Sequence, residues 1–238
     1  MEPPCFDDLS ALAPKRLARM RRAQRELSVA IRAFRRTGGH PVRDVLGGAP
    51  APFTRYAHYP TDDVDDVPRG YAWYYHAHEP GPSRPWDEHG HFHLYCYPKL
   101  FEGKATPRVL PRQGDAARDS GITHLFGLCL SEQGAPVRLF TINRWASNEH
   151  MYAAPDLLPV IDRFSLGRET PHPLVSRWLG AMVRLLHPQI GWLMHERDRV
   201  LGERRKIDPE GYSEDRTLDV VSTLAFDLGE VHAALDAA

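Results

Sequence analysis

Histidine occupies every second position in two short segments near the middle of the chain. The segments are GYAWYYHAHE at residues 70–79 and HGHFHLYCYP at residues 89–98. Their alternating histidines are His76 and His78 in the first segment, and His89, His91 and His93 in the second. Both segments are dense in aromatic residues, which favour strands, and alternate residues of a strand share a face. We therefore predict two strands that each present a row of histidines.

The loop PGPSRPWDE between these segments predicts an antiparallel hairpin. If the loop closes symmetrically, His78 lies opposite His89, and His76 lies opposite His91. A slide by two residues instead pairs His78 with His91 and His76 with His93. Both registers place all five histidines on one face, with cross-strand Cβ atoms about 4.5 to 5.5 Å apart. A slip by one residue would separate them.

The segments around the hairpin predict more strands and several helices. Apolar residues three and four apart predict a basic amphipathic helix from Pro14 to about Arg36, ended by two glycines. The stretch from Pro41 to Pro68 is irregular, with a short strand at residues 53–59 and a solvated loop at the acidic run TDDVDD. ITHLFGLCL and VRLFTINRW predict a second hairpin, which brings the number of expected main strands to four.

Helical spacing returns after Asn148. It predicts helices over residues 172–186 and 188–204 and an amphipathic helix in the tail from Thr217. The expected fold is α+β, a central, mostly antiparallel sheet with helices at the N- and C-terminal ends. We expect one domain over residues 1–238. Its parts are a basic helix (14–37), a histidine-rich sheet region (53–145) and C-terminal helices (171–235).

Composition narrows the classes of function. The formal net charge of −1 gives no global attraction to nucleic acid, so nucleic-acid binding through the basic helix ranks last among three hypotheses. The chain has no apolar run of membrane-spanning length and no apolar leader, so we expect a cytoplasmic protein without membrane contact. The cysteines Cys5, Cys96 and Cys129 form no CxxC pair, which argues against a thiolate zinc site.

Clustered imidazoles favour a transition metal, because neutral ring nitrogens bind iron, copper or zinc. We expect His76, His78, His91 and His93 to be the preferred ligands, with His89 as a fifth candidate. Three ligands with an open position would make a reactive centre, whereas four closed ligands would make a structural one. Two alternatives stay open: a metal-free pocket for a small ligand, and a purely structural layer of stacked rings.

Other polar residues are candidates for catalysis and substrate binding. Glu88 can move protons beside the metal. Tyr74 and Tyr95 offer an aromatic wall to a small-molecule substrate. His124 can reach the same face as a further ligand or lie buried as a satisfied core residue. Arg144, at the end of the fourth strand, can hold an anionic substrate or pair with a carboxylate.

The motifs YYHAHEP and EHGHFHLY, followed by THLFGLCL and RLFTINRW, resemble an uncharacterised bacterial protein family. The resemblance covers at least the middle third of the chain and implies a recurring module, with no ligand assignment. Paired histidines on antiparallel strands also resemble cupins, but no glutamate follows His78 at the cupin spacing, which argues against that family.

The leading hypothesis is therefore a metal-dependent enzyme acting on a small molecule. The second is a non-catalytic module that binds a metal, haem or another small ligand. The terminal amphipathic helices can pack within the domain or against a second copy, so a homo-oligomer is also compatible with the sequence.

Overall fold

The computed structural model describes residues 9–47, 53–79, 81–82, 84–112 and 121–238, so Cys5 lies outside the described residues. Within these ranges six strands form one sheet in the order β1-β2-β3-β4-β5-β6, and every neighbouring pair is antiparallel. The strands are β1 (Tyr59–Asp66), β2 (Tyr71–His76), β3 (Gly90–Cys96), β4 (Thr123–Leu130), β5 (Pro136–Ile142) and β6 (Val220–Ala225). The α+β class with an antiparallel sheet is confirmed.

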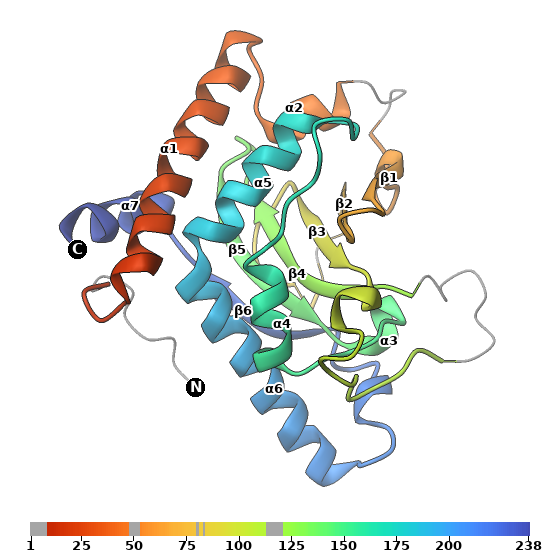
Figure 1. Ribbon diagram of the computed structural model, residues 1–238. Helices are drawn as coiled ribbons and strands as arrows, with labels where there is room; N and C mark the ends of the chain where they lie inside the picture. Colours follow the sequence, from red (N-terminus) through yellow and green to blue (C-terminus); the bar gives the residue numbers. More distant parts are fainter. Residues whose placement is uncertain (1–8, 48–52, 80, 83, 113–120) are drawn as a thin grey trace.

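The helices come from the N-terminal and C-terminal parts of the chain, before and after the first five strands (Figure 1). The α-helices are α1 (Pro14–Arg36), α2 (Pro41–Leu46), α3 (Arg144–Ser147), α4 (Ala154–Ile161), α5 (Pro173–Leu185), α6 (His187–Ile207) and α7 (Leu228–Ala237). Short 3-10 helices follow β3 (Pro98–Phe101) and precede β6 (Tyr212–Glu214). In the part of the chain that the structure describes, no helix has both the length and the apolar composition to cross a membrane.

One face of the sheet packs against α5 and α6. The indole Nε1 of Trp73 on β2 donates to Ser176 Oγ on α5 at 2.9 Å. The ring of Phe92 on β3 lies 5.9 Å from that of Trp178 on α5. These large rings are buried, and alternation along the strands turns their neighbours to the opposite face. The core therefore lies between the sheet and the helices, and the other face is left for polar side chains.

The basic helix forms as predicted and packs beside α5 (Figure 1). Its buried stripe includes Leu17, Met20, Leu27 and Phe34, with the spacing expected of an amphipathic helix. Two of its arginines, Arg16 and Arg19, each lie 2.5 Å from the carboxylate of Asp162, just beyond the end of α4. Part of the basic face therefore has an internal partner.

Two predictions from the sequence are wrong at the edges of the sheet. The strand expected at residues 53–59 is β1, which begins at Tyr59 and contains the acidic run that we expected to be a loop. Charged residues suit this edge strand, because only one of its sides is paired. The tail from Thr217 is not one helix, since Val220–Ala225 pairs with β5 before α7 begins. The apolar spacing of the tail is compatible with a single helix and with a strand followed by a helix.

Asp66, at the end of β1, shows why part of the acidic run is not solvated. Its carboxylate is buried and accepts hydrogen bonds from the backbone N–H groups of Arg69 at 3.0 Å and Gly167 at 2.7 Å. The Arg69 guanidinium adds a third at 2.9 Å. Burial alone raises the pKa of Asp66, but these hydrogen bonds hold it below 3.8. Asp66 thus ties the β1–β2 turn to the segment that precedes α5.

We expect Asp66→Asn to lower the free energy of unfolding at pH 7 by about 1 to 3 kcal/mol, because it weakens three hydrogen bonds to a buried carboxylate. The folded-state pKa is lowered, so the stabilisation is complete above the unfolded-state pKa of about 3.9 and is lost as the pH falls through the folded-state value. Urea unfolding at several pH values checks this. Asp62→Asn, an exposed change in the same strand, is the control, and an equal loss in both variants contradicts the prediction.

Candidate metal centre

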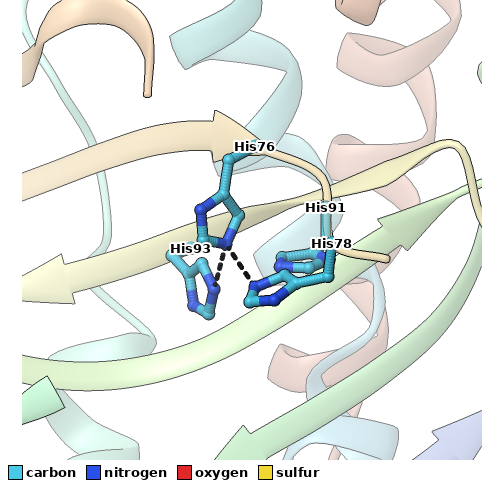
Figure 2. A group of neighbouring side chains, drawn as sticks. All are labelled: His76, His78, His91 and His93. Atoms are coloured by element: carbon cyan, nitrogen blue, oxygen red, sulfur yellow. Dashed lines mark hydrogen bonds between the residues drawn. The ribbon is translucent and has the colours of Figure 1, made fainter. Parts of the chain in front are cut away.

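The register of β2 and β3 places histidines opposite one another on the face turned away from the helices. His76 pairs with His91, and Tyr74 pairs with His93. This is the symmetric register of the two that the sequence allowed. Figure 2 shows the imidazole rings of His76, His78, His91 and His93 gathered in front of the strands, with helices behind the sheet. We call these four residues the histidine cluster.

The ring nitrogens of the histidine cluster converge. His76 Nε2 lies 3.1 Å from His78 Nε2 and 3.0 Å from His93 Nε2. One ligand atom from each of the four residues can be chosen so that all lie within 4.8 Å of one another. Metal–nitrogen bonds of about 2.0 to 2.1 Å in a tetrahedron separate the nitrogens by about 3.3 Å, so the spacing is close to that of a metal site. The cluster can therefore hold a metal ion.

His91 supplies a further observation. Its ring is fully buried, and its Nε2 atom has no hydrogen-bond partner among the described residues. A buried polar atom without a partner is costly, and native structures satisfy nearly all such atoms. A bound cation would satisfy this nitrogen together with the converging nitrogens of its neighbours.

Burial keeps the rings of the cluster neutral. It lowers the pKa of His78 to about 3, with a further contribution from the positive charge of Arg84. The pKa values of His76 and His93 are also well below the ordinary value of 6.5, again chiefly through burial and then through the neighbouring histidines. Neutral imidazole is the form that offers a lone pair to a metal.

Glu88 fixes the orientation of His91. Its Oε1 atom lies 2.7 Å from His91 Nδ1, and its Oε2 atom accepts a hydrogen bond from Trp86 Nε1 at 3.0 Å. Burial raises the pKa of Glu88, but the hydrogen bond and charge of His91, together with hydrogen bonds from Cys129 and Trp86, outweigh it, and the net pKa is about 2. The carboxylate is thus ionised and holds the proton of His91 on Nδ1, which leaves Nε2 free to bind a cation. Glu88 lies before the first residue of β3, so strand alternation does not set the direction of its side chain.

His124 supports His93 from β4. Its Nε2 atom lies 2.8 Å from His93 Nδ1, so it contacts the ring atom of His93 that faces away from His76. The backbone N–H of His124 donates to Glu149 Oε2 at 2.7 Å, and burial raises the pKa of Glu149 to about 7. His124 therefore lies behind the cluster as a neighbour of one of its members.

The structure separates His89 from the other four histidines. Its Nδ1 atom lies 2.6 Å from the hydroxyl of Tyr75, whose side chain points to the opposite face from that of His76. Its ring stacks on Phe53 at 5.3 Å. His89 precedes the first residue of β3, so the alternation that aligns His91 with His93 does not extend to it.

The candidate substrate residues lie in different places. The hydroxyls of Tyr74 and Tyr95 are 2.9 Å apart, and both residues line a pocket of about 470 Å³ beside the cluster. The His58 ring stacks on Tyr74 at 3.7 Å in the same pocket. Arg144 is buried and paired with Glu214, so its guanidinium is already engaged by a carboxylate.

Arg84 belongs to no motif or periodic pattern that would predict a role for it. It lies in the loop between β2 and β3, and its guanidinium carbon is 4.7 Å from the centre of the Phe140 ring. Arg84 also lines a pocket of about 460 Å³ together with His78 and Glu88. Its position follows from the path of the loop, which has no periodic pattern to reveal it.

Phe140 on β5 packs edge-on against the cluster, 5.0 Å from the His91 ring and 5.5 Å from the His93 ring. It can do so because Gly127, its partner on β4, has no side chain. A Cβ atom at Gly127 would lie 2.1 Å from Phe140 Cζ. The glycine thus leaves space for the ring that supports two members of the cluster.

We expect Gly127→Ala to lower the free energy of unfolding by about 1 to 3 kcal/mol, because Phe140 must move within a packed interior. Thermal and urea unfolding measure this. The control is Gly202→Ala on α6, where an added Cβ meets nothing within 4 Å. That change should stabilise the protein by about 0.5 to 1 kcal/mol. Unchanged stability of the Gly127 variant would show that Phe140 is not confined.

An antiparallel sheet covered by helices on one face, with a buried group of four histidines on the other, defines an α+β protein with a candidate metal centre. The chain belongs to the family described as a domain of unknown function (DUF6969), whose model matches residues 21–226. The match spans the whole sheet and the histidine cluster. No curated protein and no solved structure matches the chain. The family is therefore an uncharacterised one, as the resemblance implied.

Proposed function

We propose that the protein binds a transition metal ion through the histidine cluster and uses it as an enzyme on a small molecule. The observation that carries the metal site is the convergence of four neutral imidazoles, one of which, His91, has an unpartnered Nε2 atom. Nitrogen ligands without a carboxylate among them suit copper, zinc or iron and disfavour magnesium and calcium.

The supporting residues resemble the outer layer of known metal sites. Metal-bound histidines usually give their second ring N–H to a carboxylate, a carbonyl or water, and such partners fix the ring and raise its basicity. Glu88 does this for His91, and His124 contacts the second nitrogen of His93. In a purely structural layer of stacked rings, partners for the Nδ1 atoms and Nε2 atoms that converge would not be needed.

The access of the histidine cluster to a cavity supports an enzyme rather than a closed structural site. His78 follows the end of β2, is only partly buried, and lines the pocket that also contains Glu88 and Arg84. A pocket of about 460 Å³ lies in the usual size range for small-molecule sites. A bound metal would act as a Lewis acid toward substrate or water. Glu88 would position His91 and hold its proton.

A metal carrier or a structural metal site is the second candidate, because four histidines can fill a tetrahedral coordination sphere. Spectroscopy of the cobalt-substituted protein distinguishes the two. A closed site keeps its spectrum when small exogenous ligands are added, whereas an open coordination position gives new absorption bands.

The first test is elemental analysis of protein purified without a histidine tag. We expect close to one transition metal ion per chain, and we expect His93→Gln to lose it while circular dichroism shows a retained fold. His89→Gln is the matched control, since it removes a nearby histidine outside the cluster and should keep the metal. No metal in the parent protein, even after reconstitution with iron, copper or zinc, contradicts the proposal. So does full occupancy in His93→Gln.

Chelation should also destabilise the metal-loaded protein, because a ligand that binds only the folded state adds RT ln(1 + [L]/Kd) to its stability, about 2.7 kcal/mol at a free concentration of 100 Kd. Differential scanning calorimetry with and without a chelator measures the shift in Tm. His93→Gln should show no shift, and an equal shift in both proteins would place the metal elsewhere.

Glu88→Gln tests whether the carboxylate that contacts His91 contributes to metal binding. It keeps an oxygen that can accept from His91 but removes the negative charge, so the affinity for the metal should fall by about 10- to 100-fold. Competition with a chelator of known affinity measures this. Glu79→Gln is the control, because Glu79 is exposed and paired with Arg55 at 2.5 Å. Equal affinities in the parent and Glu88→Gln would assign Glu88 a packing role only.

A further inference from the structure

Arg84 places a buried positive charge beside the histidine cluster. The residue is almost fully buried, at 6% relative exposure, and its guanidinium lies over the Phe140 ring that supports His91 and His93. Its Nε and Nη1 atoms have no hydrogen-bond partner among the described residues. The carboxylate of Asp219 is 3.6 Å from Nε, outside hydrogen-bond distance. Within the described residues, the guanidinium thus has an ion-pair partner in Asp219, but two of its buried nitrogen atoms make no hydrogen bond.

A buried arginine in this position is unfavourable for the proposed metal. The four imidazoles of the cluster are neutral and contribute no charge to balance a divalent cation. Glu88 supplies one negative charge, and Asp219 lies beside Arg84 itself. Because Arg84 shares a cavity with His78, a divalent ion in the cluster and the guanidinium repel each other across a poorly hydrated interior. An anion that contacts both would lower the repulsion.

The pocket next to Arg84 can admit such an anion. His78, Glu88 and Arg84 line the same cavity of about 460 Å³, so one of the proposed metal ligands and the guanidinium share one space. The remainder of the lining includes Glu79, Asp87 and Glu132, which discourage large polyanions. A small ligand with one carboxylate fits this distribution of charge best, because guanidinium donors match carboxylate oxygens in geometry.

We propose that the metal-loaded protein binds a small carboxylate between the metal ion and Arg84, and that its substrates carry this group. The carboxylate accepts hydrogen bonds from the Arg84 guanidinium and offers its charge to the metal. The inference rests on the proposed metal site and adds the substrate class to it. Binding of metal and carboxylate should therefore be coupled, each raising the affinity for the other by the same factor.

The experiment measures the affinity for Co²⁺ in sodium acetate and in sodium perchlorate at equal ionic strength. In the parent protein, acetate should tighten Co²⁺ binding by about 5- to 150-fold. Arg84→Met removes the charge and keeps an apolar side chain of similar length. It should bind Co²⁺ more tightly than the parent in perchlorate, because the repulsion is gone, and it should lose most of the acetate effect.

Two further variants make the test specific. Arg138→Met removes an arginine that stacks on Trp86 at 4.7 Å but does not line the pocket, and it should behave as the parent does. Arg84→Lys keeps the charge and loses the forked donors. It should retain weak Co²⁺ binding in perchlorate and show a reduced acetate effect, and it serves as the test if Arg84→Met does not fold.

The outcomes separate the two proposals. If Co²⁺ binds to the parent protein but acetate does not change its affinity, the carboxylate proposal is overturned and the metal site stands. The same follows if Arg84→Met keeps the full acetate effect. If Co²⁺ binds to none of the proteins, the metal site is overturned, and the carboxylate proposal with it.

Discussion

The pairing of β2 with β3 is the interaction on which the rest of the site depends. Because His76 lies opposite His91, alternation also sets His93 beside His76 and turns Trp73 and Phe92 toward the helices. A register shifted by one residue would place aromatic rings in the cluster and histidines in the core. The burial of large apolar side chains against α5 therefore opposes any such shift, and the geometry of the histidines follows from the packing on the other side of the sheet.

Part of this arrangement follows from local pattern. The two segments of alternating histidines predict the strands and their shared face, and apolar spacing predicts α1 with its buried stripe from Leu17 to Phe34. The edge strands were less predictable. The acidic run reads as solvated because the partners that stabilise Asp66, at Arg69 and Gly167, are contributed by a turn and by a distant segment. The spacing of the tail from Thr217 suits a helix as well as a strand, and the free edge of β5 decides between them.

The candidate site also contains residues that local pattern predicts and residues that it does not. Alternation predicts the four histidines of the cluster, and it also includes His89 because it cannot reveal where a strand begins. The residues that loops and distant strands contribute to the site cannot be predicted from alternation. Arg84 comes from an irregular loop, and the contact of Gly127 with Phe140 needs the register of β4 with β5. Periodicity thus identifies groups that share a face, whereas the residues that adjust charge and space around them depend on the tertiary path of the chain.

The histidine cluster is also compact along the sequence, since all four members lie between residues 76 and 93. A hairpin closes over a short span and forms in about 1 to 10 μs, well before most contacts between distant strands. The hairpin alone can therefore bring the four imidazoles together, before α5 packs on the sheet. The residues that refine the site, His124 and Phe140, lie on later strands and join only as the sheet grows. A cation captured by the hairpin would then hold the correct register while the remainder of the protein assembles around it.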